Sequence, residues 1–125
     1  MSEQKVKILL IEDDGFLVSM YLAKFELENF AVTTADDGEK GIKLAISESP
    51  DIILLDVGLP KMDGFEVLKQ LKADSQTSRI PVILLTNLSQ QCQIEQAMKL
   101  GAVDFLIKAH FMPSEVVEKI KKYIV

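Results

Sequence analysis

Five short apolar stretches recur along this chain at intervals of 20 to 30 residues, and this recurrence constrains the fold more than any other feature of the sequence. They occupy residues 6–11, 30–35, 51–56, 81–86 and 103–108. Four of the five are nearly continuous apolar runs, which is typical of strands buried on both faces of a parallel sheet. The stretches therefore predict a parallel sheet that helices cover on both sides.

The segments between these stretches carry apolar residues at the helical period. Their approximate limits are residues 15–28, 38–47, 64–73, 89–100 and 113 onward. The first segment places Phe16 and Met20 on one apolar stripe, with Leu17, Tyr21 and Leu27 beside it. Asp14 precedes this segment and is a plausible helix N-cap. The order (βα) repeated five times predicts an α/β fold, a doubly wound five-stranded parallel sheet with the flavodoxin-like strand order 2-1-3-4-5.

Length and composition limit the class of protein further. A chain of 125 residues fits one domain spanning residues 1–125, and we expect no output domain within it. The net charge of -5 argues against direct binding of nucleic acid, because the phosphate backbone repels an acidic surface. The apolar runs are far shorter than the roughly 20 residues that span a bilayer. The single cysteine fits a reducing compartment, so we expect a cytoplasmic protein.

Polar side chains stand where the predicted strands end. Glu12 and Asp13 follow the first strand, Asp56 closes the third and Thr86 the fourth. In the order 2-1-3-4-5 these ends meet at one edge of the sheet, where such folds place their ligand site. Three neighbouring carboxylates repel one another unless a cation lies between them. Mg²⁺ suits such oxygen ligands, and a backbone carbonyl just past Asp56 could add another.

A metal site alone does not explain the presence of Thr86 and Lys108 at the same end of the sheet. Lys108 closes the fifth predicted strand. A hydroxyl and an ammonium both suit an anion. Together with the carboxylates and Mg²⁺ they describe a site for a phosphoryl group, with an aspartate oxygen as the attacking atom. We therefore predict that Asp56 is the nucleophile and phosphoacceptor.

The sequence also resembles a known family, the receiver domains of response regulators, whose CheY-like members act in two-component signalling. The resemblance covers essentially the whole chain and depends on four motifs in order. They are ILLIEDD at residues 8–14, DIILLDVGLPKMDG at 51–64, LLT at 84–86 and GAVDFLIK at 101–108.

The resemblance implies specific roles for these residues. Asp56 would be the phosphoacceptor, and Glu12, Asp13, Asp56 and the Gly58 carbonyl would hold Mg²⁺. Thr86 would be the switch hydroxyl that moves to the phosphoryl group, Lys108 would contact that group, and Phe105 would be the switch aromatic. With Asp56, Thr86 and Lys108 as its catalytic residues, such a domain catalyses its own phosphorylation and dephosphorylation and turns over no external substrate.

The resemblance also implies partners. The phosphoryl donor would be a sensor histidine kinase or a histidine phosphotransferase, and the recipient of the signal an unidentified downstream protein. The output face would combine the fourth helix, fifth strand and fifth helix, on a monomer or a phosphorylation-dependent dimer. No insertion into a membrane is expected.

Several alternatives remain open at this stage. Asp13 and Asp14 could merely cap the first helix, and Lys119, Lys121 and Lys122 are most simply a solvated helix face. A pseudo-receiver, which binds a partner without being phosphorylated, is the rival function. It is kept open by Asn87 and by Ala109, which stands after Lys108 where the family usually has a proline. The bond between Lys108 and Ala109 is expected to be trans, or else a strained cis bond.

Overall fold

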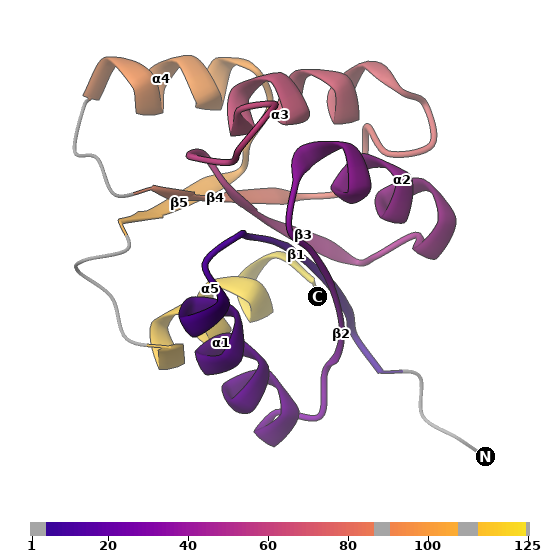
Figure 1. Ribbon diagram of the computed structural model, residues 1–125, viewed down its shortest axis with the longest axis vertical. Helices are drawn as coiled ribbons and strands as arrows, with labels where there is room; N and C mark the ends of the chain where they lie inside the picture. Colours follow the sequence, from indigo (N-terminus) through magenta and orange to yellow (C-terminus); the bar gives the residue numbers. More distant parts are fainter. Residues whose placement is uncertain (1–4, 87–90, 108–112, 125) are drawn as a thin grey trace.

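Five parallel strands form the middle layer of the molecule, in the order β2-β1-β3-β4-β5 (Figure 1). The computed structural model describes residues 5–86, 91–107 and 113–124. The strands are β1 (Lys7–Ile11), β2 (Ala31–Ala35), β3 (Ile52–Asp56), β4 (Val82–Thr86) and β5 (Asp104–Ile107). The helices between and after them are α1 (Gly15–Leu27), α2 (Gly38–Glu48), α3 (Gly64–Ala73), α4 (Gln91–Lys99) and α5 (Pro113–Tyr123).

The predicted α/β class and strand order are confirmed. Each strand begins one residue later than its apolar stretch, and each predicted helix is found within about two residues of its limits. Among the helices that the structure describes, none combines the length and the apolar character that a bilayer crossing requires.

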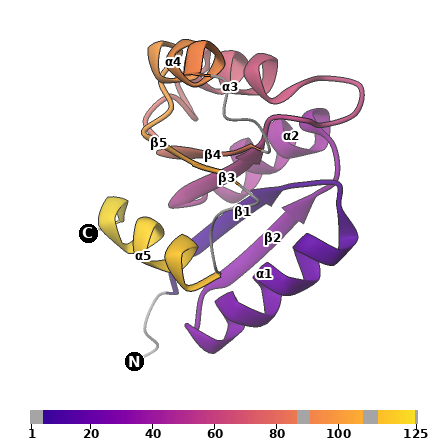
Figure 2. The ribbon, with the colours of Figure 1, turned by 90° about the vertical axis from the view of Figure 1, so that its left-hand side faces the viewer.

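Helices cover both faces of the sheet. Figures 1 and 2 show α1 and α5 on one face and α2, α3 and α4 on the other. Because successive side chains of a strand point to opposite faces, each central strand contributes to two cores. Leu9, Ile53 and Leu84 pack toward α2, α3 and α4. Ile8 and Ile52 belong to the core beneath α1 and α5.

Aspartates begin three of the helices. Asp14, Asp37 and Asp63 are the N-caps of α1, α2 and α3, and each side chain accepts hydrogen bonds from backbone N–H groups of the first turn. These bonds satisfy donors that have no partner within the helix. The prediction that Asp14 caps the first helix is therefore confirmed.

The apolar stripe predicted for α1 is only partly right. Tyr21 and Phe25 are the two buried residues of α1, and their ring centroids lie 5.9 Å apart in a stacked arrangement. Phe16 and Leu27 are instead 78% and 81% exposed. Apolar residues surround most of this helix, so the periodicity alone does not select the side that faces the core.

Candidate functional site

The register of the sheet brings three strand ends together. Ile11 of β1 lies opposite Leu55 of β3, so Glu12, the next residue after β1, comes level with Asp56 at the end of β3. Asp56 in turn lies opposite Leu85 of β4, one residue before Thr86. The carboxyl ends of β1, β3 and β4 thus lie together at the end of the sheet where the sequence predicted the site. Ligands of open parallel sheets bind at this end.

Three carboxylates meet at this edge. Glu12, Asp13 and Asp56 each offer one oxygen atom, and these oxygens all lie within 4.8 Å of one another. Glu12 and Asp56 are only 2% and 5% exposed, whereas Asp13 is exposed. Two buried acids and one facing solvent fit a hard divalent cation such as Mg²⁺, which takes carboxylate oxygens and keeps part of its water shell.

Backbone hydrogen bonds orient two of these acids. The N–H of Gly58 donates to Oδ1 of Asp56 at 3.1 Å, and the N–H of Asp13 donates to Oε2 of Glu12 at 3.1 Å. These two bonds hold the carboxylates of Asp56 and Glu12 in fixed orientations at the ends of β3 and β1.

The structure separates the roles of two adjacent aspartates. Oδ1 of Asp14 accepts hydrogen bonds from the N–H groups of Phe16 at 3.0 Å and Leu17 at 3.2 Å, so Asp14 caps α1. Asp13 belongs to the acidic cluster instead. The sequence left open whether Asp13 and Asp14 cap the helix or bind a metal. In the structure Asp14 caps α1, and Asp13 is one of the possible cation ligands.

Two further predicted residues, Thr86 and Phe105, lie in β4 and β5. Thr86 is the last residue of β4 and is 7% exposed. Phe105 lies in β5, half-buried, against the core beneath α2, α3 and α4. Lys108 and its bond to Ala109 lie outside the described residues, as does Asn87.

The sequence did not single out Tyr21 as a neighbour of the acids. Tyr21 is part of α1, and its side chain is fully buried in the core between α1 and the sheet. Burial raises the pKa of its hydroxyl, and the negative charges of Glu12 and Asp56 raise it further. The phenol therefore stays protonated near the acidic cluster. The helical period could place Tyr21 near the core, but no feature of the sequence indicated its proximity to the site.

One prediction about lysines is wrong. Lys119 does not belong to a simple solvated face, because its Nζ forms an ion pair with Oδ1 of Asp104 at 2.8 Å. Lys121, on the same helix, is more exposed and pairs with Glu28 of α1 at 2.9 Å. Both partners are distant in sequence, so the helical pattern of α5 could not reveal them.

Known proteins resemble this chain over nearly its whole length. The family model of the response regulator receiver domain matches residues 8–121. The alkaline phosphatase synthesis transcriptional regulatory protein PhoP of Bacillus subtilis is 39% identical over 115 residues, which are 92% of this chain and 47% of that protein. The response regulator PleD of Caulobacter vibrioides is 43% identical over 102 residues, 82% of this chain and 22% of that protein. The chain thus spans about half the length of the first relative and about a fifth of the second.

Solved structures share the same fold. The receiver domain of the sensor histidine kinase PA1611 of Pseudomonas aeruginosa, solved with a magnesium ion in its active site cleft, has a TM-score of 0.88 at 28% identity, covering 97% of this chain and 98% of that one. The chemotaxis protein CheY4 of Vibrio cholerae has a TM-score of 0.89 at 26% identity, covering 96% and 99%. The sequence motifs, the strand order and the position of the acidic edge therefore agree with one family of folds.

Proposed function

Because the chain belongs to the family of response regulator receiver domains, we propose that it is a signalling switch that accepts a phosphoryl group on Asp56. The observation that carries this proposal is the meeting of three carboxylate oxygens within 4.8 Å at the ends of β1 and β3. Asp56 is the last residue of β3, a strand that is buried along its whole length. The position of this carboxylate, held by β3 within the acidic cluster, supports its role as phosphoacceptor.

Glu12, Asp13 and Asp56 are the side chains that would hold Mg²⁺, with the Gly58 carbonyl as a further ligand. When bound, the ion would supply positive charge to the phosphoryl oxygens. The cluster fits this ion because its ligands are all oxygens and one side of it, at Asp13, faces solvent.

In the proposed reaction, a carboxylate oxygen of Asp56 attacks phosphorus and forms an acyl phosphate. The bond between phosphorus and the donor breaks, and the leaving group keeps the electron pair. A phosphohistidine of a sensor kinase or phosphotransferase would serve as donor, and acetyl phosphate would serve as a small substitute. Thr86 and Lys108 would bind the transferred group. The domain would catalyse both this step and its reversal by water, without an external substrate.

The switch would follow from the charge that phosphorylation adds, roughly two negative charges with three acceptor oxygens. Thr86 would turn toward these oxygens, and Phe105 would move into the space that opens. The face formed by α4, β5 and α5 would change as a result and signal to a downstream protein. We place this activity in the cytoplasm, without direct binding of nucleic acid or membrane insertion by the domain. The presence of all three acids of the cluster favours this function over that of a pseudo-receiver.

Incubation with acetyl phosphate and Mg²⁺, followed by intact-mass measurement, tests the proposal. Wild type should gain the mass of one phosphoryl group and Asp56→Asn none. Asp51→Asn is the matched control, because Asp51 is an exposed acid just before the other end of β3, where it accepts a hydrogen bond from the N–H of Lys7. This variant should still be phosphorylated. An unmodified wild type, or a modified Asp56→Asn, would contradict the proposal.

Magnesium binding is tested separately through stability. A ligand that binds only the folded state stabilises it by about 2.7 kcal/mol when present at 100 times its dissociation constant. Titration with MgCl₂ should therefore raise the melting temperature of wild type, and Asp13→Asn should lose most of that rise. Asp14→Asn is the control, since asparagine also caps helices and Asp14 lies outside the cluster. An equal loss in both variants would argue against a specific site.

A further inference from the structure

Strand β5 leaves one edge of the sheet open. It pairs with β4 on one side, and among the described residues no strand pairs with it on the other. On such an edge, alternate residues direct their backbone N–H and C=O groups away from the sheet, and these groups require other partners. Side chains bind backbone groups of Phe105, in β5, and of Val103, the residue just before the strand.

Three side chains satisfy these backbone groups. The N–H of Phe105 donates to Oδ1 of Asp104 at 2.8 Å, and the C=O of Phe105 accepts from Nζ of Lys119 at 3.2 Å. The hydroxyl of Tyr123 lies 3.3 Å from the C=O of Val103. Lys119 and Tyr123 both come from α5, so this helix covers the open edge where Phe105 lies.

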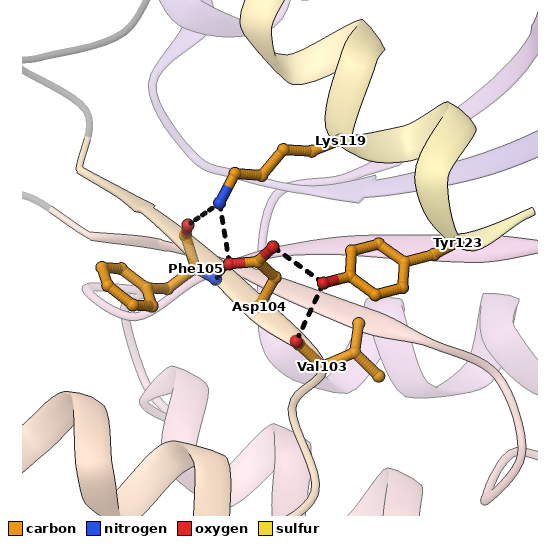
Figure 3. Close-up of polar contacts among 5 residues, drawn as sticks. All are labelled: Val103, Asp104, Phe105, Lys119 and Tyr123. Carbon is orange, nitrogen blue, oxygen red and sulfur yellow. Dashed lines mark hydrogen bonds and ion pairs between the residues drawn. The ribbon is translucent and has the colours of Figure 1, made fainter.

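Lys119 and Tyr123 also both bind Asp104, and we call these three side chains the Asp104 cluster (Figure 3). Oδ1 of Asp104 accepts from Nζ of Lys119 at 2.8 Å, and Oδ2 accepts from the Tyr123 hydroxyl at 2.9 Å. The side chains of Asp104 and Lys119 are 15% and 34% exposed, so solvent screens this pair less than it would a fully exposed one. The cluster is therefore a connected network rather than three separate contacts.

Lys119 reaches both faces of the strand. Asp104 lies on the face covered by α5, whereas the ring of Phe105 packs against the core beneath α2, α3 and α4. Nζ of Lys119 lies 5.9 Å from the centroid of that ring, within the range of a cation–π interaction. One ammonium group thus contacts the carbonyl of Phe105 and its aromatic ring.

We propose that Lys119 is a positioning residue for Phe105, held in place by Asp104 and Tyr123. It keeps the backbone and ring of Phe105 in the orientation of the unphosphorylated protein. A movement of the ring away from this position then has to give up the Lys119 contacts. This inference rests on the proposed function, in which Phe105 moves when Asp56 is phosphorylated, and it adds a restraint from α5 that sets how readily this happens.

Lys119→Met tests the restraint, because methionine keeps much of the side-chain length and loses the ammonium. Protein labelled with 4-fluorophenylalanine reports the ring by ¹⁹F NMR, and Phe105→Leu identifies its signal. In unphosphorylated Lys119→Met, the Phe105 signal should move toward its position in phosphorylated wild type. Phosphorylation by acetyl phosphate with Mg²⁺ should be faster by roughly fivefold, the effect expected from losing one partly exposed charged hydrogen bond.

Two further variants serve as controls. Lys119→Arg keeps the charge and should restore the wild-type signal and rate. Lys121→Met removes an exposed lysine ion pair from the same helix, without contact to Phe105, and should change neither. Thermal unfolding of each variant checks that it is folded at the temperature of measurement.

The outcomes separate this inference from the proposed function. If Lys119→Met leaves the Phe105 signal in place, or only lowers the melting temperature, or if Lys121→Met moves the signal equally, Lys119 does not position Phe105. A moved signal with an unchanged rate overturns its link to phosphorylation. If wild type is not phosphorylated at all, the proposed function fails, while the fluorine signal still decides whether Lys119 restrains the ring.

Discussion

Asp104 is a carboxylate whose charged form is favoured by its surroundings. Burial by itself would raise its pKa, but the hydrogen bonds from Lys119, from the Phe105 N–H and from Tyr123 together hold the pKa below its usual value. The bond to Asp104 in turn raises the pKa of the Tyr123 hydroxyl. The charged carboxylate and the neutral phenol are thus the forms that the folded state prefers.

These shifts predict a pH-dependent stability. A carboxyl pKa lowered by folding contributes stability above its unfolded value of about 4, and this contribution is lost as the pH falls through the folded pKa. Wild type should exceed Asp104→Asn by about 1–2 kcal/mol in free energy of unfolding at neutral pH. The difference should shrink in acid. It should shrink again as the pH rises from about 10, the usual pKa of a tyrosine, through the raised pKa of Tyr123, because the proton that stabilises the bond to Asp104 is then lost.

Urea denaturation of both proteins at a series of pH values between 2 and about 11 measures this difference. Glu28→Gln is a useful control, because Glu28 pairs with Lys24 and Lys121 on the surface and does not touch β5. If the difference in free energy of unfolding between wild type and Asp104→Asn stays constant across the acid range, the charge of Asp104 does not contribute to the stability of the cluster.

At the scale of elements, α3 begins unusually close to the end of β3. A Cβ atom on Gly64, the first residue of α3, would lie 2.5 Å from the carbonyl oxygen of Asp56 and 2.6 Å from Cα of Val57. The N–H of Gly64 also donates to the carbonyl of Val57 at 2.9 Å. The backbone that carries Asp56 and the first turn of α3 thus pack directly against each other.

Gly64→Ala should therefore damage the site as well as the fold. The new methyl meets backbone atoms, which cannot rotate away, so we expect a loss of about 1–3 kcal/mol in free energy of unfolding. The carboxylate of Asp56 should shift, and phosphorylation by acetyl phosphate should slow. Gly15→Ala is the matched control at the start of α1, where nothing lies within 4 Å of the added atom. It should cost no stability, and an equal loss in both variants would refute the argument from close approach.

The sequence predicted these elements well for a physical reason. Buried parallel strands read as apolar runs and helix starts carry aspartate caps, both of which are local signals. The convergence of Glu12, Asp56 and Thr86 was predictable because the carboxyl ends of neighbouring parallel strands share one edge. The side of α1 that faces the sheet could not be predicted, because that helix is apolar on most sides.

Contacts between segments distant in the chain also could not be predicted from the sequence. Lys119 and Asp104 are 15 residues apart, and their ion pair exists only because α5 lies over the edge of β5. Neither the helical period of α5 nor the short strand indicates that contact. The same holds for Tyr21, whose approach to the acidic cluster depends on how α1 packs.

At the scale of the whole molecule, one sheet carries a separate hydrophobic core on each of its two faces. Ile52 and Leu54 of β3 point to the α1 and α5 side, while Ile53 and Leu55 point to the other side. All four are fully buried. A disturbance on one side of the sheet therefore reaches the other through the backbone of the same strands. This arrangement predicts that the two cores unfold together.

The two tyrosines allow a direct test of this cooperativity. Tyr21 is buried in the core beneath α1 and α5 and Tyr123 packs against it, so tyrosine fluorescence reports that side, and the chain has no tryptophan to mask it. Far-UV circular dichroism reports all helices. Leu71→Ala removes a fully buried side chain of α3 on the opposite side and should cost about 2–5 kcal/mol.

In urea, both signals of Leu71→Ala should move to the same lower midpoint, with an unchanged slope, because the strands transmit the loss of one core to the other. Phe25→Ala, in the core beneath α1 and α5, should behave in the same way with a cost of about 3–5 kcal/mol. If the cores were independent, Leu71→Ala would lower the midpoint seen by circular dichroism and leave tyrosine fluorescence at its wild-type midpoint. Since β3 lies between β1 and β4 and supplies both cores, coincident transitions are the expected result.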